Sequence, residues 1–271
     1  MNPPLLSILY QDQAVVVVDK PGGLLSVPGR GADKQDSVSE RLRTCFPGCI
    51  RQPAVHRLDM DTSGLMVLAL TAAAHRHLSA QFAAGRVGKR YLAILDGETR
   101  EVGGEIRLPF RLDPEDRPRQ IYDPQQGRWG VSLWRRLGLL SGLSLVEFIP
   151  LTGRTHQLRL HASHARGLGC PIVGDRLYGS GRPGEPLLLH AAWLRFIHPV
   201  TGQVMLLHSA PPQEAGVVSS LPCRAGSGFG CPSNPGPCPE RRVRDWRFFP
   251  CFFCIFPATV PGRTKGAGQS G

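Results

Sequence analysis

The chain changes composition near residue 213, and this change limits how much of it can fold. Up to that point, short β-branched runs alternate with segments that carry helix-capping residues. Beyond it, the chain is rich in Pro, Gly and Cys and has the period of neither a strand nor a helix. We therefore expect one folded domain over residues 1–213 and a disordered, basic tail over residues 214–271.

Local signals in the folded part predict an alternation of strands and helices. Strands are expected at 14–19, 64–70, 91–95, 130–136, 143–149 and 187–197. Ser37 and Glu40 are spaced as a capping box, which predicts a helix that begins near Ser37. A second helix is expected to follow Thr71 and to end at a glycine, Gly85 or Gly88. A third is expected over 155–166.

The charge of the chain indicates a polyanionic partner. Its 32 Lys and Arg residues outnumber its 21 Asp and Glu residues, which gives a formal net charge of +11. Residues 217–271 contribute seven basic and two acidic residues, so the folded part is basic on its own. The sequence has no apolar run of about 18 residues and no signal peptide. We therefore expect no membrane contact and a cytoplasmic location.

The cysteines do not form a disulfide framework in the folded part. Only Cys45, Cys49 and Cys170 lie there, too few and too scattered for a framework, so we expect free thiols. Five more lie in the tail and include one C-x-x-C pair, Cys251 and Cys254. Because the tail has no second close pair and no histidine, we expect no zinc knuckle.

Six separated motifs follow one another in the folded part. They are DKPGGLLSVPG (19–29), HRLDMDTSG (56–64), KRYLAIL (89–95), TGRTHQLRLH (152–161), GCPIVGDRLYG (169–179) and LLLHA (187–191). In this order they resemble the RluA family of pseudouridine synthases. Two further segments, LLSVPGRGADKQDSV at 24–38 and RPRQ at 117–120, resemble the short branch of that family, which acts on both tRNA and large-subunit rRNA. Only 18 residues precede the first motif, so we expect no S4 domain before it.

The resemblance implies an α+β fold of the pseudouridine synthase type. Its central, mostly antiparallel and bisected β-sheet would be flanked by helices, with a cleft between the two halves. One segment departs from the family pattern, because 127–134 reads GRWGVSLW where the family has GKxAxTxY. Gly130, Ser132 and Trp134 therefore replace the usual residues. This departure concerns the packing of one strand, not the chemistry.

The implied reaction breaks the N1–C1′ bond of a uridine, rotates the uracil and rejoins it to the sugar through C5. Nothing is oxidised and no atom is lost, so a redox cofactor has no task. The folded part also has no GxGxxG motif, P-loop or cluster of metal ligands. The resemblance therefore implies a monomeric isomerase without cofactor or metal. Its RNA partners would be the anticodon stem-loop of tRNA and a hairpin of large-subunit rRNA.

The motif HRLDMDTSG selects Asp59 as the carboxylate that acts at the sugar, as nucleophile or as base. Asp61 is the alternative, and without the resemblance either acid would be an ordinary turn residue. A carboxylate in a dry cleft needs a cation to stay ionised. The resemblance assigns this pairing to Arg159, with a bidentate geometry. It also implies that Tyr91 stacks on the uracil and takes part in removing the C5 proton.

Further residues are expected to contact the RNA. A uridine in a stacked loop must be extruded to reach a carboxylate, and its departure leaves a gap in the stack. We expect the planar guanidinium of Arg57 to fill this gap. The other expected RNA contacts come from His56, Arg117, Arg119 and Arg154.

Two other groups of residues have structural interpretations. Lys20 and Pro21 are expected to shape the floor of the cleft. His156, His161 and His164 lie on the predicted helix 155–166, but no Cys or carboxylate is spaced to complete a zinc site. We therefore expect these histidines to pack within the fold.

Three other functions are compatible with parts of the sequence. The same chemistry could act on a different rRNA site. An RNA-binding protein, such as a chaperone that remodels loops, would use the cleft without turnover, but Asp59, Tyr91 and Arg159 would then have no task. A glycosidase-like hydrolase commonly needs two carboxylates at a controlled separation, and the motifs place only one.

Overall fold

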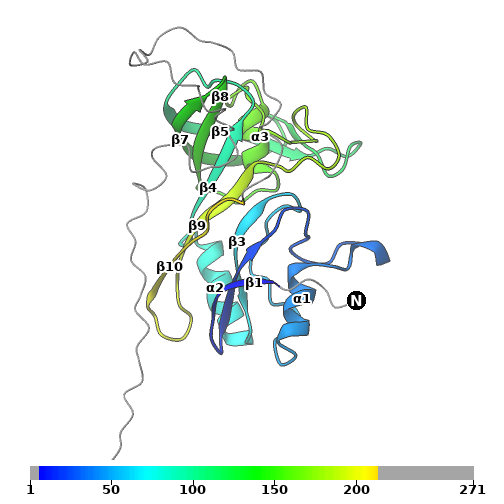
Figure 1. Ribbon diagram of the computed structural model, residues 1–271, viewed down its shortest axis with the longest axis vertical. Coiled ribbons are helices and arrows are strands. Elements are labelled where there is room, and N and C mark those ends of the chain that lie inside the picture. Colours follow the sequence, from blue (N-terminus) through cyan, green and yellow to red (C-terminus); the bar gives the residue numbers. More distant parts are fainter. Residues whose placement is uncertain (1–5, 213–271) are drawn as a thin grey trace, which may run out of the picture.

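The computed structural model describes residues 6–212, which form a 10-stranded sheet with helices packed on it (Figure 1). In spatial order the strands are β1 (Ser7–Gln11), β2 (Val15–Lys20), β3 (Ser63–Ala69), β9 (Leu189–Ile197), β4 (Gly88–Leu95), β8 (Leu143–Pro150), β7 (Arg128–Leu140), β5 (Gly103–Leu112) and β6 (Gln120–Tyr122), and β10 (Val204–His208) pairs with β9. In this described part, β3 and β9 pair in parallel and the other neighbours are antiparallel. The predicted α+β fold is confirmed, whereas the predicted tail lies outside the described residues.

The helices begin where capping residues satisfy their first N–H groups. The Ser37 side chain accepts from Glu40 N at the start of α1 (Val38–Cys45), and Thr71 Oγ1 accepts from Ala74 N at the start of α2 (Ala72–Ala83). Gly85, in the left-handed region at φ 66°, follows Ala84, the C-cap of α2. Both helix starts were predicted from these residues.

The third helix is shorter than predicted. The spacing predicted a helix over 155–166, but α3 spans only Gln157–Ser163. His156 has left-handed backbone angles (φ 55°, ψ 18°), so the helix cannot begin before Gln157, and His164 is extended, which ends it. The predicted bounds were therefore wrong at both ends.

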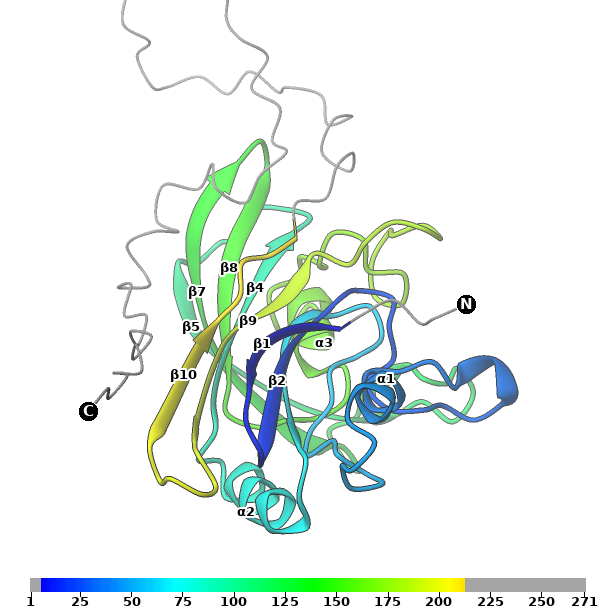
Figure 2. The same cartoon turned by 60° about the horizontal axis from the view of Figure 1, so that its bottom comes forward.

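Side chains on β2 and β3 alternate between two helices. Val15, Val17, Leu65 and Val67 pack in one cluster with α2, whereas their neighbours in sequence pack in another with α1. Figure 2 shows α1 and α2 on opposite sides of these strands. Because both faces are covered, each strand contains a continuous apolar run, residues 15–18 in β2 and 65–69 in β3.

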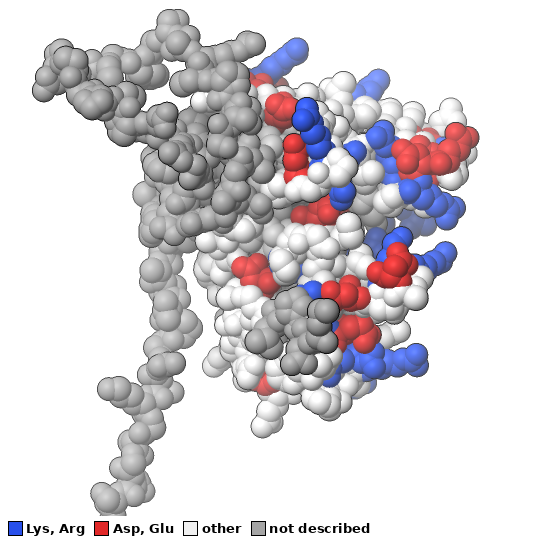
Figure 3. Space-filling model, turned by 45° about the vertical axis from the view of Figure 1, so that its right-hand side comes forward, with Lys and Arg blue, Asp and Glu red and all other residues white. Residues whose placement is uncertain are grey.

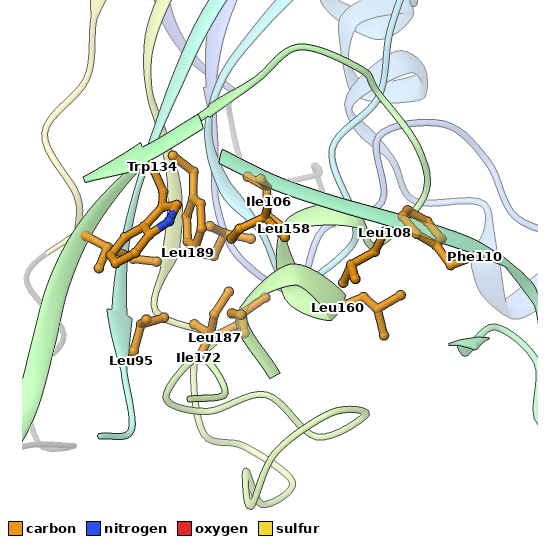
Figure 4. Close-up of a cluster of buried hydrophobic side chains, with 14 residues drawn as sticks. Leu95, Ile106, Leu108, Phe110, Trp134, Leu158, Leu160, Ile172, Leu187 and Leu189 are labelled. Atoms are coloured by element: carbon orange, nitrogen blue, oxygen red, sulfur yellow. The ribbon is translucent and has the colours of Figure 1, made fainter. Parts of the chain in front are cut away.

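The other half of the sheet packs on α3. Ala93 and Leu95 of β4 share a cluster with Leu158 and Leu160 of α3, as Figure 4 shows for the labelled residues. Tyr91 packs against the same cluster, so Tyr91, Ala93 and Leu95 share one face of β4. Trp134, one of the residues that depart from the family pattern, fills this core, and β7 remains paired with both β5 and β8 across it.

The two halves meet where β3 and β9 run in parallel. Gly64 pairs with Ala191 there at φ 110°, and a Cβ on Gly64 would lie 2.5 Å from the Ala191 carbonyl oxygen. Glycine is required at this approach. The end of the HRLDMDTSG motif is thereby fixed at the junction of the halves.

Two further findings concern the surface and the thiols. Cys45, Cys49 and Cys170 are free, as predicted. Within residues 6–212, no helix combines the length and the apolar composition that crossing a membrane requires.

Candidate active site

A cavity of about 760 Å³ lies at the junction of the two halves. Its walls come from the loop before β3, the end of α2, the strand β4 and the segment that leads from β8 into α3. Six of the residues predicted from the sequence line it: His56, Arg57, Asp59, Tyr91, Arg154 and Arg159. These residues are separated by up to a hundred positions in the chain, and the fold brings them together.

The loop that carries Asp59 is held on both sides of this residue. Ser26 Oγ donates to the Leu58 carbonyl (2.7 Å) and accepts from the Leu58 N–H (3.0 Å). Lys20 Nζ donates to the Met60 carbonyl at 2.8 Å. The Asp59 side chain, 21% exposed, is therefore presented to the cavity from a backbone fixed at its neighbours.

Lys20 places a buried cation under this loop. Its Nζ also donates to the carbonyls of Leu24 (2.7 Å) and Pro21 (2.9 Å), and the side chain is fully buried. Burial lowers the pKa of Lys20 to about 8, although the charges of Asp61 and Asp59 act to raise it. At neutral pH the ammonium is therefore charged. In the described part of the chain, Lys20 and Pro21 are not among the residues that line the cavity, so their expected place in the cleft floor stays a prediction.

The two acidic residues of the motif have different environments. Asp59 lines the cavity, whereas Asp61 forms an ion pair with Arg176 at 3.1 Å. Asp61 is not among the residues that line the cavity in the described part of the chain. The geometry therefore distinguishes two residues that the sequence places only two positions apart.

Arg159 does not form the predicted bidentate pair with Asp59. Its fork binds Asp175 instead, with Nε to Oδ2 at 2.8 Å and Nη2 to Oδ1 at 2.6 Å, and both side chains are almost fully buried. Burial acts to lower the pKa of Arg159, but Asp175 and, more weakly, the charge of Asp59 raise it overall. Arg159 is therefore a fixed charge in the cavity wall that acts on Asp59 through its field. The expectation was wrong because Asp175 fills the fork.

Tyr91 presents its ring to the cavity from β4. Burial and, next, the charge of Asp59 raise the pKa of its hydroxyl, so the phenol is neutral at physiological pH. A neutral ring in the wall of a cavity can stack on a planar base.

His56 and Arg57 lie at the start of the same loop but differ in exposure. The His56 ring stacks on Phe82, with centroids 4.5 Å apart, and its Nε2 accepts from Val67 N at 3.1 Å. Burial and the charge of Lys89 lower the pKa of His56 to about 3, so the ring is neutral. Arg57 is exposed and donates from Nη2 to Thr155 Oγ1 at 3.1 Å.

Arg117 and Arg119 lie between β5 and β6, outside the cavity lining. Arg117 is exposed, whereas the Arg119 guanidinium donates to the Leu177 carbonyl and lies over the Tyr178 ring at 5.6 Å. In the view of Figure 3, Lys and Arg side chains lie along one side of the described body with acidic side chains between them. The RNA contacts of Arg117 and Arg119 stay predictions.

Three residues without a predicted chemical role lie around Asp59 and Arg159: His156, Asp175 and Tyr178. Asp175 and Tyr178 belong to GCPIVGDRLYG, so their motif was a signal, although nothing in the spacing named their partners. His156 was grouped with His161 and His164, but the structure separates the three, which contact Tyr178, Phe110 and Tyr122 respectively.

Comparisons with known proteins agree with this geometry. Residues 14–164 match the family model described as RNA pseudouridylate synthase. The chain is 43% identical over 215 residues to the dual-specificity RNA pseudouridine synthase RluA of Haemophilus influenzae, which covers 77% of this chain and 95% of that protein. For the protein of the same name from Escherichia coli (strain K12), the identity is 42% over 206 residues, covering 74% and 91%.

Two solved human structures are also similar. RNA Pseudouridylate Synthase Domain Containing 1 has a TM-score of 0.63 at 33% identity and covers 79% of this chain and 88% of its own. RNA Pseudouridylate Synthase Domain Containing 4 has a TM-score of 0.61 at 26% identity, covering 76% and 89%.

Proposed function

Since the chain belongs to the RNA pseudouridylate synthase family, whose members convert uridine to pseudouridine in RNA, we propose that Asp59 acts on the uridine in the cavity described above. The observation that carries this assignment is that Asp59 lines the cavity between two anchored neighbours, while Asp61 is paired with Arg176. The catalytic domain is proposed to occupy residues 1–213.

The Asp59 carboxylate is proposed to act at the ribose, as nucleophile at C1′ or as base toward the 2′ position. Two cations lie near it. The Lys20 ammonium lies beneath its loop, and the Arg159 guanidinium lies in the same cavity wall. The N1–C1′ bond breaks, the uracil rotates, and C5 bonds to C1′.

Tyr91 is proposed to hold the rotating uracil and to help remove the C5 proton. The product gains a proton at N1 and loses one at C5, so the reaction needs no external oxidant or reductant. The raised pKa of Tyr91 keeps its hydroxyl protonated, so this group can relay a proton but does not start as a free base.

Arg57 is proposed to occupy the gap that the extruded uridine leaves. Its guanidinium is exposed at the cavity rim, where it donates to Thr155 Oγ1. Extrusion costs a few kcal/mol of lost stacking, which a planar cation inserted in the stack offsets in part. His56 and Arg154 are proposed to contact the flanking RNA from the same rim.

The proposed substrates are the anticodon stem-loop of tRNA and a hairpin of large-subunit rRNA. The bacterial relatives named above are called dual-specificity enzymes, and this chain aligns with more than nine-tenths of their length. The basic charge of the chain supports a polyanionic substrate. We propose that the enzyme acts as a monomer in the cytoplasm, without metal or cofactor.

The proposal is tested by tritium release from RNA labelled at uridine C5. The wild-type chain should release tritium from both hairpins, while Asp59→Asn should bind them and release less than about one-thousandth as fast. Binding without release by the wild-type chain would favour the RNA-chaperone alternative. Tritium release from only one of the two hairpins would show that the enzyme acts on that RNA alone and would contradict dual specificity.

A further inference from the structure

His156 is held rigidly beside Asp59 by contacts that the proposed reaction does not yet use. Its backbone is left-handed at φ 55°, its side chain is 7% exposed, and its ring lines the cavity. Nδ1 lies 2.9 Å from the Tyr178 hydroxyl, and Nε2 lies 4.0 Å from Asp59 Oδ1. The two ring nitrogens therefore face different groups, and the position of the ring proton decides what His156 offers to Asp59.

The contacts of Tyr178 determine where that proton resides. Two groups of the described chain lie within hydrogen-bond distance of its hydroxyl: the Gln120 N–H, at 2.7 Å, and His156 Nδ1. The backbone N–H can only donate, so the hydroxyl proton is satisfied only when it is given to Nδ1. Burial raises the pKa of Tyr178 to about 12, so the hydroxyl retains this proton. A neutral imidazole that accepts at Nδ1 carries its own proton on Nε2, toward Asp59.

The charges around His156 favour the neutral ring. Burial lowers its pKa, and the nearby cations Arg159 and Arg57 act in the same direction, while Asp59 and Asp175 oppose them. Together with Tyr178, these are the titratable and charged groups that face the ring. The Nε2–H is thus a neutral donor that does not discharge the carboxylate opposite it.

Asp175 holds the rest of this arrangement in place. Its Oδ1 accepts from Tyr178 N at 3.1 Å, and the same carboxylate binds the fork of Arg159. The Arg159 guanidinium lies 5.3 Å from the centre of the Tyr178 ring. One buried carboxylate therefore fixes both the cation near Asp59 and the tyrosine that orients His156.

From this geometry we propose that His156 is a positioning residue, whose Nε2–H donates to the Asp59 carboxylate and orients it toward the ribose. The inference rests on the proposed function of Asp59. The separation of 4.0 Å is longer than a hydrogen bond. The bond forms when the carboxylate moves by about 1 Å as the nucleotide fills the cavity, since catalytic hydrogen bonds commonly tighten in the substrate complex.

Two substitutions distinguish the role of the His156 side chain as a hydrogen-bond donor from the role of its left-handed backbone. The side-chain nitrogen of Gln reaches the place of Nε2, whereas that of Asn is too short. Asn, however, tolerates left-handed backbone angles better than Gln does. We expect His156→Gln to keep kcat for tritium release within about tenfold of wild type, and His156→Asn to lose about 100-fold in kcat with little change in KM.

A residue that served only the turn into α3 would give the opposite order, with His156→Asn the better enzyme. Such a result, or equal kcat values for the two variants, would overturn the proposal. Asp59→Asn is assayed in parallel. If Asp59→Asn turns over normally, the proposed function itself fails. If Asp59→Asn is inactive and the two His156 variants are equally active, only the positioning role fails.

A second measurement needs no variant at His156. Nitrogen NMR of the full chain with labelled histidine reports which ring nitrogen carries the proton. We expect Nε2 in the wild-type protein and a mixture of the two tautomers in Tyr178→Phe, which removes the hydroxyl. A wild-type ring protonated at Nδ1 would overturn the proposal even if every His156 variant failed to fold.

Discussion

At the scale of single residues, the site depends on charges that are buried where water cannot stabilise them. Lys20 satisfies three backbone carbonyls and Asp175 satisfies a guanidinium and two N–H groups. Lys20 thereby holds the loop that carries Asp59, and Asp175 holds the side chain of Arg159. Such groups are costly to bury alone and stabilising only with their partners.

Titration of Lys20 should make the stability of the fold rise with pH and the activity fall. Its pKa is about 8 in the folded chain, and a lysine in an unfolded chain titrates near about 10.4. Between these values the unfolded state binds more protons, so the contribution of Lys20 to stability rises with pH. Activity should fall over the same range, because the neutral amine loses one of its three donors and its charge beneath Asp59.

Both trends are measured as kcat and as the free energy of unfolding against pH, with Lys20→Met as the control. That variant should be slower at every pH and should lack both changes. Wild-type activity that rises through pH 9, with no difference between the two proteins, would contradict this role for Lys20.

Removing the charge of Asp175 should destabilise the fold strongly. Asp175→Asn leaves the Arg159 guanidinium buried without its counter-ion, which costs about 3–5 kcal/mol. Asp61→Asn is the matched control, because the Asp61–Arg176 pair is partly exposed and such pairs contribute at most about 1 kcal/mol. Denaturant unfolding of both variants measures the difference. Equal losses would show that burial of the Arg159 pair is unimportant.

Some of these residues could be predicted from the sequence and others could not. Asp59, Tyr91 and Arg159 were brought to one cavity as the motifs implied, because each motif overlaps a core element (β3, β4 or α3) whose place the hydrophobic pattern indicates. The pairing of Arg159 with Asp175 could not be predicted. Asp59 and Asp175 are both possible partners of the Arg159 guanidinium. The guanidinium binds Asp175, the fully buried carboxylate, and burial is decided only when the segments pack.

At the scale of secondary-structure elements, the parallel contact between β3 and β9 joins the two halves of the sheet. Only Ser63 and Gly64 take part in it from the β3 side. Because so short a contact has few hydrogen bonds, it depends on the close approach of the two backbones. The position of Asp59, four residues before this contact, depends on it.

Gly64→Ala should therefore disrupt the sheet at its centre. The new Cβ would lie 2.5 Å from the Ala191 carbonyl oxygen, in a backbone conformation that alanine also disfavours. We expect a loss of stability above about 3 kcal/mol, against about 1–2 kcal/mol for Gly23→Ala, which has a positive φ but nothing within 4 Å of its Cβ. Thermal unfolding of the two variants compares them. A loss for Gly64→Ala no larger than that for Gly23→Ala would indicate that the contact tolerates a side chain.

The elements that were predicted are those whose burial is visible in their own sequence. β2 and β3 contain continuous apolar runs, residues 15–18 and 65–69, because helices cover both of their faces. β1 and β10 were missed, since each alternates between exposed and half-buried residues and is stabilised by its neighbour. β5 contains two glycines and Pro109, which disfavour a strand locally, yet it pairs with β7 along its length.

At the scale of the whole molecule, the fold places a negative carboxylate inside a basic protein. A net charge of +11 attracts RNA of any sequence, and the cavity is proposed to select the base. Affinity and chemistry are therefore separable, because the arginines of the rim can be neutralised without touching Asp59.

Binding of the hairpins should weaken steeply with salt, and arginines of the rim should set part of that slope. Each phosphate contact removed lowers the slope of log K against log salt by about 0.7 for single-stranded RNA. Arg57→Gln and Arg154→Gln should each show this loss, whereas Arg107→Gln, on β5 and outside the cavity lining, should not. Fluorescence titration of a labelled hairpin at several salt concentrations measures the slopes. Unchanged slopes in both rim variants would argue against RNA crossing this rim.

The most direct test of the account compares Asp59→Asn with Asp61→Asn in single-turnover tritium release from a uridine-labelled hairpin. The two changes remove the same charge two residues apart in the same loop, and only Asp59 lines the cavity. We predict a loss of at least about 1,000-fold for Asp59→Asn and at most about tenfold for Asp61→Asn. Equal rates for the two variants, or a greater loss for Asp61→Asn, would contradict the account.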